Sequence, residues 1–284
     1  MTGKTTHKIY QIFYNSKTKE ENDKGFLQLD NSSNLRPDWS EYWPIRNYLL
    51  SNDLSSRSYY GFFSPKFKQK TNLTSDDVHK YLDSAKQDIV IFSPFFDQSA
   101  MSLNVFEQAE SSHSNVYPTL IDTFQALGAQ IDIKRMVMTS RETVFCNFFA
   151  AKKHVWEVWF DYCEKLFEIC ESSTSPLATP LNVAIGHSGG VNPLKVFVME
   201  RMISYLIVTN IDWSVKTYNP VRLPYTDPFI AMFEKELLEL DALKISFCAT
   251  GLPKYIDEYA DKRFEFVTRI NNILDGLKST QRQL

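Results

Sequence analysis

The sequence predicts an α/β protein with a mainly parallel central sheet, and two observations carry this prediction. Short runs rich in β-branched and aromatic residues alternate along the chain with segments of helical periodicity. Two of these runs, YYGFFSPKF at 59–67 and IVIFSPFFD at 89–97, pass directly into Ser-Pro. Proline ends a strand because it has no N–H group for the ladder. Open α/β sheets bind ligands beyond the carboxyl ends of their strands, so we expect a ligand at these Ser-Pro corners.

The first part of the chain supplies most of the predicted strands. Residues 8–15 alternate as a strand does, and the polar residues 16–34 are expected to form a loop. Asp38 or Ser40 is placed to cap a helix that runs to about Leu50. The elements expected after it are, in order, the strand at Tyr59, a helix over 74–83 and the strand at Ile89.

The rest of the chain is predicted to be mostly helical. Residues 152–170 place apolar side chains on one stripe, which is typical of a helix packed on a core. The helix over 193–208, capped by Asn192, is apolar nearly all round and should be buried. We expect residues 1–225 to form one domain and residues 226–284 a helical extension packed on it. The other expected elements are a helix over 117–127 ended by Gly128, a short strand over 130–138, a loop over 182–193 and two amphipathic helices after Asp227.

Composition excludes several classes of function. The 31 basic and 34 acidic residues are well mixed and give a net charge of −3, so no basic stripe predicts nucleic-acid binding. The five histidines lack the spacing of a zinc site, and the four cysteines do not form a disulfide framework. No glycine-rich dinucleotide or Walker-type motif occurs. With no signal-peptide core and no membrane-length apolar run, we expect a soluble cytoplasmic protein.

Two charges interrupt the apolar helix over 193–208. Glu200 and Arg201 stand where burial is expected, and such side chains are rarely buried without a partner. Either they form a structural ion pair, or they face a polar cavity. A carboxylate on a cavity wall is the usual form of a general base.

Several segments together resemble the bacterial glycosyltransferases that build capsules and lipopolysaccharides. The segments are IYQIFYN, the acidic-aromatic SEYWPIRNYLL, YYGFFSPKF and DIVIFSP, followed by NFFAAK at 147–152 and by the pair Glu200-Arg201. The resemblance spans residues 8–210. It implies a GT-A-like, Rossmann-type sandwich that uses a nucleotide-sugar donor and an oligosaccharide or lipid-linked glycan acceptor. It also implies peripheral association with a membrane biosynthetic complex at the inner face of the membrane.

The resemblance implies that the donor's base lies over the end of the first strand. Tyr10, Gln11 and Tyr14 follow there and could stack on or hydrogen-bond a base, although both tyrosines could equally alternate with core residues. Trp43 and Arg46 share a helix face that lines either the donor site or the core. Asn147 and His187 are assigned to the acceptor.

The sequence departs from the GT-A pattern at its metal motif, because no Asp-x-Asp occurs in the chain. In its expected place stand Lys66 and Lys68, which we assign to the donor's diphosphate, and Lys70, which is expected to be solvated. No cofactor is certain, and a divalent cation, Mn²⁺ or Mg²⁺, remains the alternative. Asp97 is then its first candidate ligand, or else the catalytic base.

We assign Glu200 and Asp97 to catalysis, and Arg201 to phosphate binding or to structure. The alternative function is a non-catalytic nucleotide- or glycan-binding module of a polysaccharide biosynthesis machine. Hydrolysis at GHSGG (186–190) is a third interpretation, although no strand-to-helix turn with an ordered triad accompanies that segment.

Overall fold

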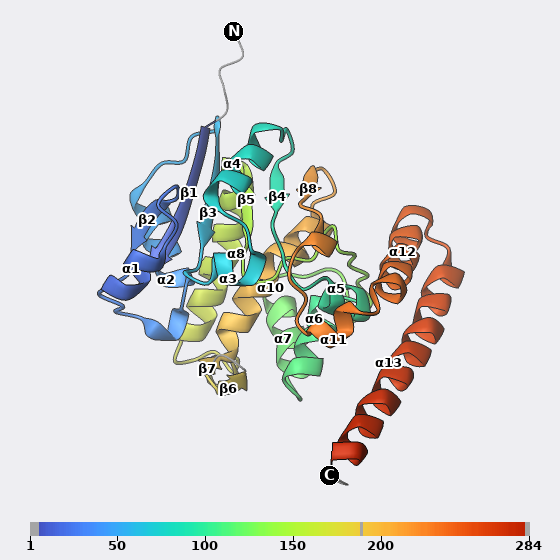
Figure 1. The fold of residues 1–284 in the computed structure, drawn as a ribbon. Coiled ribbons are helices and arrows are strands. Elements are labelled where there is room, and N and C mark those ends of the chain that lie inside the picture. The colour runs from blue at the N-terminus through green and yellow to red at the C-terminus, as the bar shows by residue number, and fades with distance from the viewer. Residues whose placement is uncertain (1–5, 188–189, 282–284) are drawn as a thin grey trace.

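The computed structural model describes the backbone of residues 6–187 and 190–281, with the side chains of 187 and 277–281 left undescribed. Its centre is a six-stranded sheet in the order β2-β1-β3-β5-β4-β8 (Figure 1). Five strands run parallel, and β5 runs antiparallel between β3 and β4. The strands are β1 (Thr6–Phe13), β2 (Leu27–Asp30), β3 (Ser58–Phe63), β4 (Ile89–Ile91), β5 (Phe149–Ala151) and β8 (Val215–Thr217). The predicted α/β class with a mainly parallel sheet is confirmed, with one antiparallel strand added.

Strand β3 shows why the sheet is buried on both faces. All six of its residues are buried. Tyr60 and Phe62 join the larger core cluster, while Tyr59 and Phe63 join the smaller one on the opposite face. The strand ends at Phe63, directly before Ser64-Pro65, as the proline predicts.

The two faces of the sheet carry different helices. The larger core cluster receives buried residues from α2, α6, α7, α8 and α10, and the smaller one from α3 and α4. The helices of this part are α1 (Ser16–Glu21), α2 (Tyr42–Ser51), α3 (Phe67–Thr71), α4 (Ser75–Asp83), α5 (Phe96–Met101), α6 (Val105–Ser112), α7 (Tyr117–Ala126), α8 (Lys153–Glu171), α9 (Ala178–Leu181) and α10 (Leu194–Thr209). Two 3₁₀ turns, η1 (Pro37–Trp39) and η2 (Pro220–Arg222), complete it.

Several expectations about local structure are wrong. The helix expected after Asp38 or Ser40 begins at Tyr42, and neither side chain caps it. Residues 16–34 hold α1 and β2 instead of a loop; Asn15 caps α1 through the Thr18 N–H, and β2 is a half-exposed edge strand with a weak pattern. Residues 130–138 form no strand, because the Asn104 amide takes the carbonyls of Ile133 and Met136. Residues 182–193 contain the hairpin β6 (Ala184–His187) and β7 (Gly190–Pro193), and α10 begins after Pro193 without a side-chain cap from Asn192.

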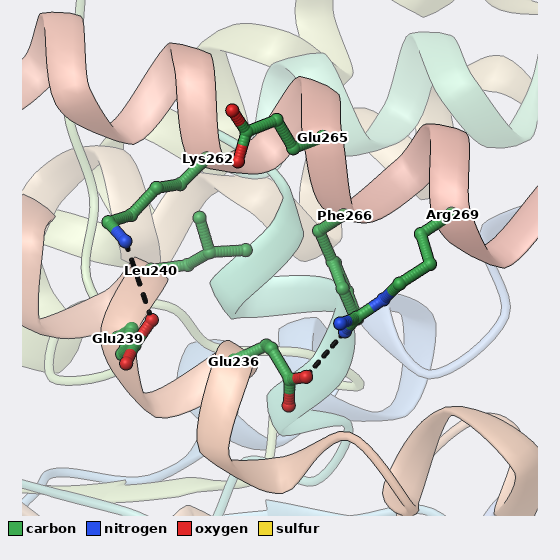
Figure 2. A pocket seen from close by; sticks show the side chains of 7 residues that line it. All are labelled: Glu236, Glu239, Leu240, Lys262, Glu265, Phe266 and Arg269. Carbon is green, nitrogen blue, oxygen red and sulfur yellow. Dashed lines mark hydrogen bonds and ion pairs between the residues drawn. The ribbon is translucent and has the colours of Figure 1, made fainter.

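The C-terminal helices α11 (Pro228–Ala231), α12 (Glu234–Thr250) and α13 (Pro253–Gln281) stand beside the sheet, with α13 extending past the body of the protein (Figure 1). Their apolar cluster includes Phe96 and Ala100 of α5, which joins them to the rest of the chain. The crevice between α12 and α13 is bridged by two ion pairs, Glu236–Arg269 and Glu239–Lys262 (Figure 2). Most of its charged side chains pair with one another, so we interpret this crevice as a contact between two helices.

Candidate functional site

The chain changes direction across the sheet at β1 and β3. From β1 it passes to β2 on one side, and then crosses to β3 on the other side of β1. Such a switch point opens a crevice at the carboxyl ends of the two strands, where α/β proteins bind ligands. Tyr14 follows the end of β1, and Ser64-Pro65 follow the end of β3.

A cavity of about 870 Å³ lies at this switch point. Both sides of the switch contribute to it, through Tyr14 after β1 and through the Ser64-Pro65 corner after β3. Its volume is within the range of small-molecule sites. The other charged and thiol side chains that line it are Glu21, Glu41, Lys66, Lys68, Lys70, Cys146 and Glu200.

Gln11 builds this corner and is itself buried. Its Nε2 donates to the carbonyls of Ser64 and Pro65 at 3.3 and 3.4 Å, and its Oε1 accepts from the Asp23 N–H at 2.9 Å. Both ends of the amide are therefore used within the protein. The structure places Gln11 as a positioning residue behind the cavity wall, where we expected a contact with a base.

Three lysines stand on the cavity wall because of the short helix α3. Phe67 fixes that helix by stacking on Phe63, with ring centroids 4.2 Å apart. Lys66 precedes the helix and Lys70 follows four residues later, so the two share a face. Within the described residues, neither these two lysines nor Lys68 has a carboxylate within the 4 Å of an ion pair. These lysines therefore offer positive charge to a ligand, while the carboxyl groups of Glu21, Glu41 and Glu200 line the same cavity.

Lys70 is half-buried, whereas we expected its side chain to be solvated. Its Nζ donates to the Cys146 Sγ at 3.0 Å. Burial lowers the pKa of Lys70, but Cys146 and the carboxylates of Glu200 and Glu41 outweigh it, so the net shift is upward. Burial also raises the pKa of the Cys146 thiol to about 11. At neutral pH Lys70 is thus a cation beside a neutral thiol.

A second, smaller cavity of about 350 Å³ meets the first one. The two share Lys70, Cys146, Phe197 and Glu200 as lining residues. The smaller cavity lies beside the second Ser-Pro corner, where the Ser93 Oγ accepts from the Phe145 N–H at 2.8 Å. The repeated Ser-Pro corner thus frames two adjoining cavities, one after β3 and one after β4.

Glu200 stands at the junction of the two cavities. Burial is the largest cause that raises the pKa of its carboxyl, and Glu41 adds to the rise, while Arg201 and Lys70 oppose it. A carboxylate with a raised pKa between two cavities suits a general base. Arg201 lines only the smaller cavity, where it donates to the carbonyls of Val105 and Phe197 and to the Gln108 Oε1.

The structure connects Asp97 and the two acceptor candidates, Asn147 and His187, less directly with the two cavities. Asp97 is buried in α5, where its Oδ1 accepts from the Thr226 N–H at 3.0 Å, and its Oδ2 has no hydrogen-bond partner among the described residues. Burial raises the pKa of this carboxyl. Asn147 has a left-handed backbone next to Cys146 but does not line either cavity. His187 ends β6, and its side chain lies outside the described residues.

The remaining candidates point away from the cavities. The Tyr10 hydroxyl is 2.8 Å from that of Tyr48, and its ring stacks on Phe62 in the larger core cluster. Trp43 and Arg46 face α8, where the guanidinium donates two hydrogen bonds of 2.7 and 2.8 Å to Glu164. These residues join α2 to α8, so the core alternative holds for that helix face.

Among the described residues, no three His, Cys, Asp or Glu side chains converge as metal ligands would. The carboxylates that do line the larger cavity share its wall with three lysines. We therefore derive no step through a metal.

The structure is an α/β protein with a cavity, and so a candidate ligand site, at the switch point of its sheet. No protein-family model, curated protein or solved structure matches the chain. The helices of the described part include none that is both long and apolar enough to cross a membrane.

Proposed function

We propose that the chain is a GT-A-like glycosyltransferase that moves a sugar from a nucleotide-sugar donor to a glycan acceptor of the bacterial surface. The observation that supports this most is the wall of three lysines at the switch point, without ion-pair partners in the described residues, facing a cavity of about 870 Å³. A diphosphate carries the negative charge that such a wall would neutralise. The enzyme would work in the cytoplasm, at the inner face of the membrane.

In the proposed reaction each group has one role. Lys66, Lys68 and Lys70 hold the diphosphate, and the Tyr14 ring lies on the same cavity wall for the nucleoside. An acceptor hydroxyl attacks the anomeric carbon while the bond from that carbon to the diphosphate oxygen breaks. Glu200 takes the hydroxyl proton, and the electron pair leaves on the diphosphate. The lysines stabilise the charge that develops there.

A thermal-shift panel of UDP-, GDP-, CMP- and dTDP-sugars, with and without manganese, tests the proposal. Binding to the folded state raises the melting temperature by mass action, so one nucleotide class should raise it clearly. Turnover with a glycan acceptor then separates an enzyme from a nucleotide-binding module. No shift with any donor would contradict both.

A further inference from the structure

The smaller cavity has a polar wall whose hydrogen-bond direction is fixed. Arginine has only donors, so the Arg201 Nη2, 2.8 Å from Gln108, requires the amide oxygen of Gln108 to face it. The Gln108 Nε2 then donates to the Gln98 Oε1 at 3.3 Å and to the Ser112 Oγ at 3.0 Å. Both hydrogens of that nitrogen are used, and the oxygen of Gln98 is occupied.

The chain of hydrogen bonds therefore ends in free donors. The Gln98 Nε2 has no acceptor among the described residues, and Gln98 lines the cavity. Arg201 uses three of its five N–H groups, on the neutral acceptors Val105, Phe197 and Gln108. Its positive charge has no carboxylate within ion-pair distance in the described part of the chain. The nearby Glu200 carboxyl lines the same cavity and acts on Arg201 electrostatically, without an ion-pair contact. A ligand that brings acceptors and negative charge would satisfy the free donors.

The apolar part of the wall suits a sugar ring. Phe95, Phe145 and Phe197 line the cavity, and the rings of the first two lie 6.3 Å apart. A pyranose has an apolar face of C–H groups that packs against aromatic rings. Phe95 and Cys146 have φ values of +68° and +60°, which non-glycine residues rarely adopt and which concentrate at functional sites.

We infer that this smaller cavity binds the acceptor through an acidic sugar, whose carboxylate or phosphate accepts hydrogen bonds from Gln98 and Arg201. This inference rests on the proposed function, because it takes the larger cavity as the donor site. The acceptor hydroxyl then reaches Glu200, which lies at the junction of the two cavities. The class of acceptor is thus a glycan that ends in a uronic-type or phosphorylated sugar.

Saturation-transfer NMR with three probes tests this inference. Sodium glucuronate, glucose 6-phosphate and glucose are each added to the full chain, with UDP, GDP, CMP and dTDP measured separately. We expect at least one anionic probe to bind at least about tenfold more tightly than glucose, and the preferred one distinguishes carboxylate from phosphate. Equal binding of all three probes, or no binding of any, overturns the inference.

Two variants of Gln98 test whether this side chain supplies the donors that bind the anionic probe. Gln98→Glu replaces donors by a negative charge, and Gln98→Met removes the donors without adding charge. Both should weaken binding of the anionic probe, by tenfold or more for Gln98→Glu, and leave nucleotide binding unchanged. Gln125→Glu, at an exposed position on α7, is the matched control and should bind as the wild type does.

The proposed nucleotide-sugar function and the acidic-sugar site in the smaller cavity can be contradicted separately. Nucleotide binding without any preference for an anionic sugar removes the inference and leaves the proposed function. Anionic-sugar binding that depends on Gln98, without nucleotide binding, removes the proposed function and keeps the smaller cavity as a site. Unchanged anionic-probe binding in Gln98→Glu contradicts the assignment of the donors.

Discussion

At the scale of single residues, the position of Glu200, the proposed general base, reduces the stability of the fold at neutral pH. The carboxyl has a raised pKa because it is removed from water and faces Glu41, although Lys70 and Arg201 are near. A folded-state pKa above the unfolded value means that stability is present at low pH and is lost as pH rises through the folded pKa. The ionised form that a general base needs is thus the form that the fold tolerates least.

The first prediction follows from this direction of the change in stability with pH. Glu200→Gln should unfold at a higher temperature than the wild type at pH 7, because it removes a charge that is partly withdrawn from water and keeps the shape. The difference should shrink as pH falls through the raised pKa and become small below the ordinary value of 4.5, where the wild-type carboxyl is mostly protonated in both states. Thermal unfolding of both proteins between pH 4 and pH 8 measures it. A variant less stable at pH 7 would mean that Glu200 is held by an ion pair.

The second prediction concerns turnover by the same variant. Loss of a general base typically costs 10²–10⁴-fold, so Glu200→Gln should reduce kcat by at least about a hundredfold. Affinity for the donor should change little, because the lysines hold the diphosphate. Steady-state kinetics and donor binding measured side by side decide it. Near-normal kcat would move the search for a base to Asp97, the buried carboxylate with a free Oδ2 in the described structure.

At the scale of elements, the packing of α2 on α8 explains the acidic-aromatic segment SEYWPIRNYLL. Trp39 and Tyr42 are buried, and both Tyr42 and Arg46 bond Glu164 of α8. The Arg46 guanidinium also lies 4.5 Å from the centre of the Phe167 ring. The segment therefore holds two helices together on one face of the sheet.

The third prediction tests that role. Arg46→Ala should lower the free energy of unfolding by about 1 kcal/mol, as expected for a partly exposed pair. Donor affinity should stay unchanged, since Arg46 does not line either cavity. Denaturant unfolding and calorimetric donor titration give the two values, with the exposed Arg57→Ala as control. A loss of donor affinity at unchanged stability would return Arg46 to the donor site.

Elements with a strong local signal could be predicted from the sequence, and those set by long-range contacts could not. The ends of β3 and β4 follow from Ser-Pro, and α8 follows from its apolar stripe. The segment 130–138 reads as a strand, but the side chain of Asn104 takes its carbonyls instead. No sequence pattern near Asn104 or within residues 130–138 predicts those hydrogen bonds.

The residues of the candidate site also fall into those that the sequence predicts and those that it does not. Tyr14, Lys66, Lys68 and Glu200 were expected from their place after strands or in an apolar helix, and all four line the larger cavity. Lys70 was expected in solvent, because its direction depends on the short helix α3. Glu41 and Cys146 reach the cavity through a helix start and a left-handed turn, which the residue types alone do not reveal.

At the scale of the whole molecule, buried polar anchors dock α12 on the sheet domain. The Lys244 Nζ donates to the carbonyls of Ser99, Ser102 and Met138 at 2.5–2.8 Å. Asp241, one turn earlier, accepts from the N–H and hydroxyl of Ser140. Because Ser99 belongs to α5, and because Gln98 of α5 and the preceding Phe95 line the smaller cavity, the C-terminal helices support the candidate site from behind.

The fourth prediction concerns this anchor. Lys244→Met keeps the side chain's volume but leaves three buried carbonyls without their donor, so it should cost on the order of 2 kcal/mol of stability. The exposed Lys235→Met, on the same helix, should cost little. Chemical denaturation of both variants measures the difference. Equal stability would show that α12 is held by its apolar contacts alone.

The account's central claim is that the lysine wall holds a nucleoside diphosphate at the switch point. The most direct measurement is calorimetric titration of UDP, GDP, CDP and dTDP in EDTA, with wild type, the double variant Lys66→Met/Lys70→Met and the control Lys153→Met on α8. We predict that one nucleotide binds the wild type and the control alike, and binds the double variant at least about tenfold more weakly, because two phosphate contacts are lost. Binding that disappears in EDTA and returns with manganese, or that is unchanged in the double variant, would contradict the claim.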